Sequence, residues 1–254
     1  MKFYMFGYSF SSSPKNSFFL SPMSASILKD RTPENVGKMS LVNLFSIQFP
    51  HPFSNTPSEF NIYAGRLIIK LLLDERLNKK LYIDEACYFL PFIESVNLNQ
   101  YEELVRSILE FRSLSFDEKD RLFRLEKDCD EIFANVVHEF NYYFLRIFNG
   151  LNVLDIIGDP NYNCGKLHSF HHGNGETYRT DAFASRQSYS GYFKIKDNLI
   201  HSAKLLIENY SPFDRPKTLA DDDIFSEEDL ILELYQNKPL AYLSTINPSM
   251  NKNR

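Results

Sequence analysis

The stretch YRTDAFASRQSYSGYFKIKDNLIHS, Tyr178 to Ser202, decides the predicted fold. Residues 178–190 suit an amphipathic helix, because Tyr178, Ala182 and Tyr189 share one stripe at about 100° per residue. Two β-like runs, YFKI and LIHS, follow on either side of an Asp-Asn turn and predict a hairpin. A helix that runs directly into a hairpin is typical of winged-helix folds.

Helices are predicted elsewhere in the chain wherever apolar residues recur at helical spacing. They cover residues 60–78, 82–90 (disturbed at Pro91), 99–112, 116–150 (one or two helices that end at Gly150) and 203–210. A short strand at 151–158 and a polar loop at 159–175 follow the helix that ends at Gly150 and precede the helix predicted at 178–190. The sequence therefore predicts a mainly α protein with small β wings (α+β), built from winged-helix-like DNA-recognition domains.

Four segments are expected along the chain. Residues 1–57 are predicted to form an ordered but irregular N-terminal arm, and residues 58–150 a helical, winged-helix-like subdomain. Residues 151–213 would supply the loop, the recognition helix and the β wing, and residues 214–254 an acidic, linker-like tail.

Composition indicates a globular protein outside membranes. The chain has 254 residues, 43% of them hydrophobic, which is enough to bury a core. Its longest apolar run, Leu67 to Leu73, is interrupted by Lys70, and the start lacks the layout of a secretory signal. The three cysteines are far apart, which favours reduced thiols. We expect a cytoplasmic protein with no membrane partner.

The charge is unevenly distributed. The net charge is −5, and seven acids lie between Asp221 and Glu233. Residues 161–220, in contrast, hold eight lysines or arginines and four histidines against five acids. A local basic patch attracts a polyanion more than the whole-chain sum does, so this block predicts double-stranded DNA as a partner.

The sequence lacks the common catalytic motifs. The commonest restriction-type nuclease site needs an acid followed later by Glu-x-Lys or Asp-x-Lys, which hold Mg²⁺ and activate water. The chain contains no Glu-x-Lys, and its one Asp-x-Lys, Asp117 to Lys119, opens a predicted helix, where acids complement the helix dipole. No phosphate loop, dinucleotide fingerprint or Gly-x-Ser-x-Gly occurs. We therefore expect no catalytic residue and no cofactor in this chain.

A zinc site in the polar loop is the alternative for its histidines. Cys164, His168 and His171 are all suitable zinc ligands. Their spacing fits no common finger or ribbon, and a fourth ligand would have to come from Asp159 or His172. The favoured interpretation is a DNA-facing loop without metal.

The basic block supplies the candidate DNA contacts. Arginine recognises guanine, glutamine recognises adenine, and phenylalanine can touch the methyl group of thymine. Loop histidines and asparagine, together with lysines on the wing, suit phosphates. The predicted DNA-binding residues are Lys166, His168, His171, His172, Asn174, Arg179, Thr180, Phe183, Arg186, Gln187, Lys194 and Lys196.

Several stretches together resemble the DNA-recognition region of type IIS restriction endonucleases of the AlwI- and FokI-like class, including the related nicking enzymes. They are YMFGYSFSSSPKN (Tyr4 to Asn16), QFPHPF (Gln48 to Phe53) with the helical segments after it, and RTDAFASRQSYSGYFKIKDNLIHS. The resemblance implies winged-helix recognition of a short asymmetric DNA site. It also implies a separate Mg²⁺-dependent cleavage domain or subunit that cuts outside the site. Because the nuclease motif is missing, whether this chain is itself an enzyme stays open.

Two other functions remain alternatives. One is a non-catalytic winged-helix regulator that binds DNA, and the other is a protein–protein interaction module that uses the acidic helices of residues 61–140. The sequence predicts the recognition part of a restriction-modification nuclease ahead of both.

Overall fold

The computed structural model describes residues 6–9, 18–50, 60–122, 146–157, 169–170, 177–178, 191–218, 221 and 239. This part of the chain is mostly helical and contains a small three-stranded sheet. The helices of eight or more residues are α1 (Pro22–Lys29), α2 (Pro33–Ser46), α3 (Ala64–Leu73), α5 (Leu98–Ser113) and α10 (Ile200–Asn209). Shorter helices are α4 (Ile83–Phe89), α6 (Phe116–Leu122) and α8 (Arg146–Gly150), with 3-10 turns η1 (Glu75–Leu77), η2 (Leu90–Phe92) and η6 (Asp197–Leu199).

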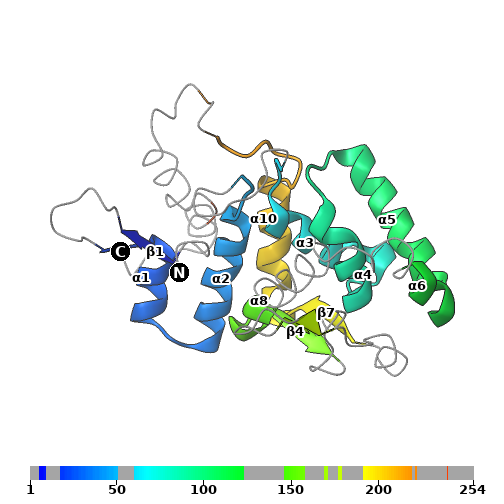
Figure 1. Ribbon diagram of the computed structural model, residues 1–254. Coiled ribbons are helices and arrows are strands. Elements are labelled where there is room, and N and C mark those ends of the chain that lie inside the picture. The colour runs from blue at the N-terminus through cyan, green and yellow to red at the C-terminus, as the bar shows by residue number, and fades with distance from the viewer. Residues whose placement is uncertain are drawn as a thin grey trace.

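The three-stranded sheet is antiparallel and has the order β3 (Leu81–Tyr82), β7 (Tyr192–Ile195), β4 (Leu154–Ile157). Two short ladders lie outside it, β1 (Gly7–Ser9) with β2 (Phe18–Leu20) and β5 (Ser169–Phe170) with β6 (Thr177–Tyr178). Figure 1 shows the helices α2, α3, α4 and α10 on one side of the β4–β7 pair. One face of the sheet is therefore covered by helices.

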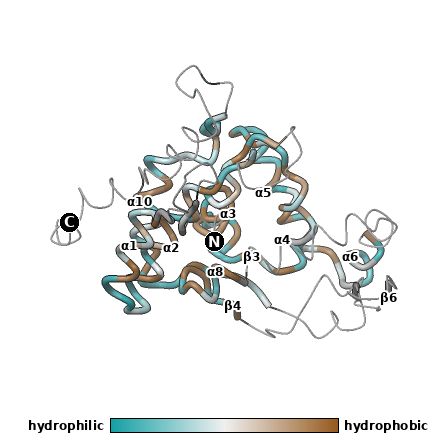
Figure 2. The backbone as a smooth tube through the Cα atoms, turned by 60° about the vertical axis from the view of Figure 1, so that its left-hand side comes forward, coloured by the Kyte–Doolittle hydropathy of each residue, from teal (hydrophilic) through white to brown (hydrophobic). Residues whose placement is uncertain are grey.

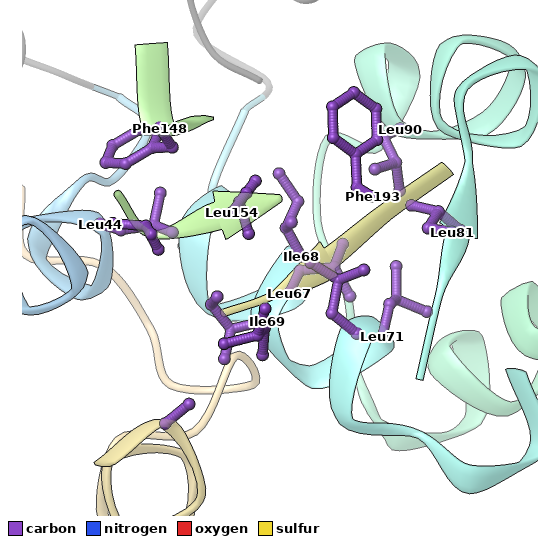
Figure 3. Packing of buried hydrophobic residues seen from close by; sticks show 14 of the residues in the cluster. Leu44, Leu67, Ile68, Ile69, Leu71, Leu81, Leu90, Phe148, Leu154 and Phe193 are labelled. Atoms are coloured by element: carbon purple, nitrogen blue, oxygen red, sulfur yellow. The ribbon is translucent and has the colours of Figure 1, made fainter. Parts of the chain in front are cut away.

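One hydrophobic cluster holds these elements together. It contains buried residues of α2, α3, α5 and α10 and the inner face of the sheet. Leu81 lies opposite Phe193, and Leu154 lies opposite Ile195, and all four side chains are buried. Figure 3 shows Leu154 beside Ile68 of α3 and the ring of Phe193 beside Leu90. Along helices such as α3 and α5 hydrophobic and hydrophilic positions alternate, so these helices bury one stripe in this core (Figure 2).

Helix α3 lies unusually close to α2. A Cβ added to Gly65 would lie 2.0 Å from the carbonyl oxygen of Leu44, so only glycine permits this approach. The sheet packs on α3 through β7, and α3 in turn packs on α2, which fixes the base on which the candidate site is built.

Most predicted helices are confirmed. Helices α3, α5 and α10 occupy the expected segments, and α4 ends where Pro91 disturbs it. Asn97 caps α5, because its side-chain oxygen accepts from the backbone N–H of Gln100. The side-chain oxygen of Gln100 accepts in return from the backbone N–H of Asn97. The strand expected within 151–158 is β4. Helix α8 ends at Gly150 as predicted, although the residue with positive φ is Asn152 (φ 61°).

The expectation of an irregular arm at residues 1–57 is wrong for its described part. That segment contains α1 and α2, and Leu41, Leu44 and Phe45 of α2 are fully buried. Each helix begins with a hydroxyl N-cap followed by proline, Ser21-Pro22 and Thr32-Pro33. This part of the chain therefore belongs to the core.

The predicted hairpin at Tyr192–Ser202 is also wrong. YFKI forms β7, but the chain then turns through η6 directly into α10, and the partners of β7 are β3 and β4. Likewise Thr177 and Tyr178 form β6, so the helix expected from residue 178 does not begin there. Residues 179–190 lie outside the described part.

The winged-helix arrangement stays a prediction, as do the four segment boundaries. Within the described ranges no helix is both long and apolar enough to cross a membrane.

Candidate nucleic-acid interface

The outer face of the sheet carries polar and aromatic side chains. Because strand residues alternate between faces, burial of Phe193 and Ile195 turns Tyr192 and Lys194 outward. Tyr82 pairs with Tyr192 across β3 and β7, and Asp155 pairs with Lys194 across β4 and β7. This outer face is the candidate interface.

The same sheet fixes both ends of the segment that holds most of the predicted DNA contacts. Ile157, the last residue of β4, pairs with Tyr192, the first residue of β7. Residues 158–191 therefore leave the sheet and return to it at adjacent positions. Within this segment Ser169 pairs with Tyr178 and Phe170 with Thr177.

Ten of the twelve predicted DNA-binding residues lie between the two ends of this segment, and all ten fall outside the described residues. They are Lys166, His168, His171, His172, Asn174, Arg179, Thr180, Phe183, Arg186 and Gln187. Cys164 of the alternative zinc site lies outside them as well.

The two predicted residues that the structure describes, Lys194 and Lys196, lie together at β7. Lys196 Nζ is 2.6 Å from Asp155 Oδ1, and Lys194 Nζ is 3.2 Å from Asp197 Oδ1. Their side chains are 31% and 29% exposed. Both ammonium groups can be reached from solvent, but each has a carboxylate neighbour that offsets its charge.

Sequence reasoning missed a cation–aromatic cluster on the same face. Lys80 Nζ lies 5.1 Å from the ring centre of Tyr82 and 5.0 Å from that of Tyr192. The two rings meet edge to face with centres 5.8 Å apart. Arg112 of α5 lies on the Tyr82 ring as well, its Cζ 5.1 Å from the ring centre. We call Lys80, Tyr82, Tyr192 and Arg112 the tyrosine cluster.

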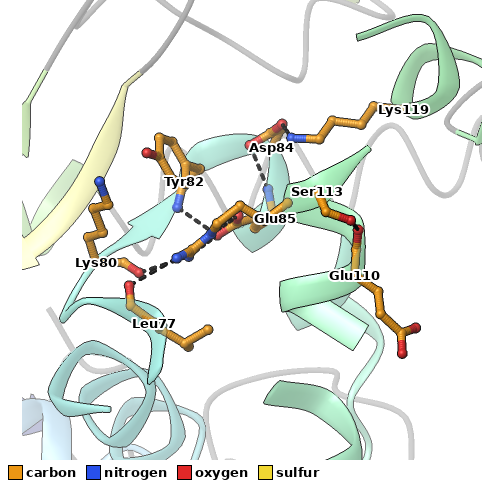
Figure 4. A network of polar contacts seen from close by, with 9 residues as sticks. Leu77, Lys80, Tyr82, Asp84, Glu85, Glu110, Ser113 and Lys119 are labelled. Atoms are coloured by element: carbon orange, nitrogen blue, oxygen red, sulfur yellow. Dashed lines mark hydrogen bonds and ion pairs between the residues drawn. The ribbon is translucent and has the colours of Figure 1, made fainter. Parts of the chain in front are cut away.

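A buried ion pair holds β3 and α4 to α5 beneath this cluster (Figure 4). Glu85 is fully buried and accepts from Arg112 Nε at 2.7 Å and Nη2 at 2.8 Å. Arg112 also donates to the carbonyl oxygens of Leu77 (3.0 Å) and Lys80 (3.2 Å). The backbone amide of Tyr82 donates to Glu85 at 3.0 Å. The backbone of Lys80 and Tyr82 is thus fixed independently of their side chains.

The electrostatics of Arg112 follow from this pair. Burial alone would lower the pKa of its guanidinium, but the hydrogen bonds and charge of Glu85 outweigh it and raise the pKa above its ordinary value. Arg112 is therefore a permanently charged structural group, with its donors directed to Glu85 and to backbone carbonyls.

The Asp-x-Lys motif has a structural role. Glu118 Oε2 accepts from the amide of Ser115 at 2.8 Å, and the Ser115 hydroxyl accepts from the amide of Glu118 at 3.3 Å, which is a capping box at the start of α6. Lys119 pairs with Asp84 of α4 at 3.5 Å. Over the described stretches of chain no three His, Cys, Asp or Glu side chains are grouped to hold a metal ion.

Known proteins resemble this chain over nearly its whole length. The family model described as type II restriction endonuclease HgaI, N-terminal domain, matches residues 1–210. A curated relative, type II restriction enzyme HgaI of Avibacterium volantium, is 32% identical over 253 residues, covering 99% of this chain and 50% of the relative. The chain thus spans about half the length of that relative, and no solved structure matches. The AlwI- and FokI-like assignment stays a prediction. The chain belongs to the family of N-terminal domains of HgaI-type type II restriction endonucleases.

Proposed function

We propose that this chain is the DNA-recognition part of a type II restriction endonuclease of the type IIS kind, and that it binds a short asymmetric duplex site. One observation carries the proposal. The segment 158–191, which holds ten of the twelve predicted DNA contacts, is anchored at both ends, through Ile157 and Tyr192, on a sheet whose outer face presents the cations Lys194 and Lys196. Membership of a restriction-endonuclease family supports DNA as the ligand.

Chemistry supports a division of roles between the segment and the sheet. Arg179, Arg186 and Gln187 are side chains that distinguish bases in the major groove. Lysines beside a sheet suit the phosphate backbone, which supplies affinity without sequence preference. We assign base recognition to the segment 158–191 and phosphate contacts to the sheet.

Cleavage is assigned to residues outside this chain. Mg²⁺-dependent hydrolysis needs carboxylates grouped with a lysine, and the one Asp-x-Lys does not fit, because Glu118 caps α6 and Lys119 is paired with Asp84. A cleavage domain or subunit would supply that chemistry to the recognition part.

Selection of binding sites tests the proposal. The purified chain would be incubated with a random duplex library, and the bound DNA amplified and sequenced over several rounds. The proposal predicts enrichment of one short non-palindromic sequence. An unenriched library despite salt-dependent binding would favour a DNA-binding protein without specificity, and the absence of binding at low salt would contradict DNA recognition.

A second function has one specific observation in its favour. A pocket of about 520 Å³ lies beside α5, and Leu98 and Leu109 on that helix are 57% and 37% exposed. This surface belongs to the acidic helices considered for protein–protein interaction. It becomes the leading candidate only if the chain binds no duplex.

A further inference from the structure

The cations of the sheet's outer face differ in whether a carboxylate offsets them. Lys194 pairs with Asp197, Lys196 with Asp155, and Arg112 with Glu85. Among the residues that the structure describes, no carboxylate lies within ion-pair distance of Lys80. Among the described cations of this face, its ammonium group is therefore the one without a carboxylate neighbour.

Aromatic rings hold Lys80 without neutralising it. Figure 4 shows its side chain running alongside the ring of Tyr82, and Tyr192 lies at a similar distance from the ammonium group. Each such contact attracts the ammonium group through the quadrupole of the ring and leaves the positive charge in place. The two rings thus favour the position of the lysine beside them before any anion binds, which lowers the entropy cost of binding one.

The position of Lys80 follows from the strand pairing. Tyr192 lies between Tyr82 on one side and Ile157 on the other, so the tyrosine cluster adjoins the residue where segment 158–191 returns to the sheet. A duplex bound by that segment would bring its backbone towards this face.

We propose that Lys80, held beside the rings of Tyr82 and Tyr192, binds a phosphate of the DNA backbone beside the recognition segment, with the hydroxyl groups of the two tyrosines as further donors. This inference rests on the proposed function and adds a contact that neither the sequence nor the family match assigned. Tyrosine hydroxyls donate to phosphate oxygens in protein–DNA complexes, and lysine supplies the counter-charge.

Salt dependence of binding tests the contact. Affinity of the full chain for its selected duplex would be measured from 50 to 200 mM salt for wild type, K80M, K80R and the control K204M, whose lysine lies exposed on α10. K80M keeps the aliphatic stem between the rings and removes the charge. We expect its slope of log K against log salt to fall by about one unit, so a fourfold rise in salt weakens wild type roughly 3–4-fold more than K80M. K80R and K204M should keep the wild-type slope.

Two further results decide the matter. Y192F removes one hydroxyl group only and should weaken binding about 2–10-fold, the effect of one hydrogen bond, without changing the slope. A wild-type slope for K80M, or an equal loss in K204M, overturns the phosphate site but leaves the proposed function standing. If wild type binds no duplex, the proposed function fails and the phosphate site fails with it.

Discussion

The ion pair between Glu85 and Arg112 should be the most expensive polar interaction of the described structure to break. Replacing Arg112 by methionine keeps a long aliphatic side chain but leaves a fully buried carboxylate without its cation. Removing one partner of a buried pair costs about 3–5 kcal/mol of unfolding free energy. For a chain of this size each kcal/mol lowers the melting temperature by roughly 2–4 °C, so R112M should melt roughly 6–20 °C below wild type.

Urea unfolding followed by circular dichroism measures this loss. The double variant E85L/R112M removes both charges and should recover most of it, remaining about 1 kcal/mol below wild type because the Tyr82 amide loses its acceptor. The control is K38M, which breaks the exposed i,i+4 pair with Glu34 and should cost about 0.3–0.5 kcal/mol. If R112M costs no more than K38M, or the double variant is as unstable as R112M, the reasoning is refuted.

Three other outcomes are expected. Burial alone would raise the pKa of Asp74, but hydrogen bonds from Arg76 and Tyr101 lower it below its ordinary value. The ionised carboxylate therefore stabilises the folded state above the unfolded pKa of about 3.9, and this contribution is lost as the pH falls below that value. Between pH 5 and 3 the unfolding free energy of D74N, measured by urea titration, should fall less than that of wild type. The variant G65A should lose about 1–3 kcal/mol of unfolding free energy, because the added Cβ meets the carbonyl of Leu44. The control G150A has open space around its added Cβ and should melt at the wild-type temperature or slightly above it. The purified chain with Mg²⁺ should not nick plasmid DNA, and nicking activity that co-purifies with the protein would contradict this.

The sequence predicted those helices whose apolar stripes are narrow and whose ends carry signals. Helix α5 is an example, with Asn97 and Gln100 as its capping box. Helix α2 was not predicted, because Leu41 to Ser46 are all buried and no polar face marks a helical period there. Its Thr32-Pro33 start was the available signal.

The hairpin error had a similar origin. Leu199 and Ile200 have strand propensity, yet burial of Leu199, Ala203 and Leu206 at i, i+4 and i+7 favours the helix that forms. Core packing therefore overrode local preference.

The tyrosine cluster could not be predicted from local patterns. Lys80 and Tyr192 are more than a hundred positions apart, and only the pairing of β3 with β7 brings them together. No residue pattern near Lys80 indicates that partner. The lysines on β7, in contrast, were predicted because they lie in the basic block itself.

Base preference of arginine variants tests the central claim most directly. The chain selects a site from the random library, and affinities of wild type, R179A and R186A are then measured against every single base change in that site. We expect at least one arginine variant to lose about 1–3 kcal/mol on the selected site and to tolerate all four bases at one position, with preference elsewhere unchanged. Wild-type affinity and preference in both variants would contradict recognition by this segment.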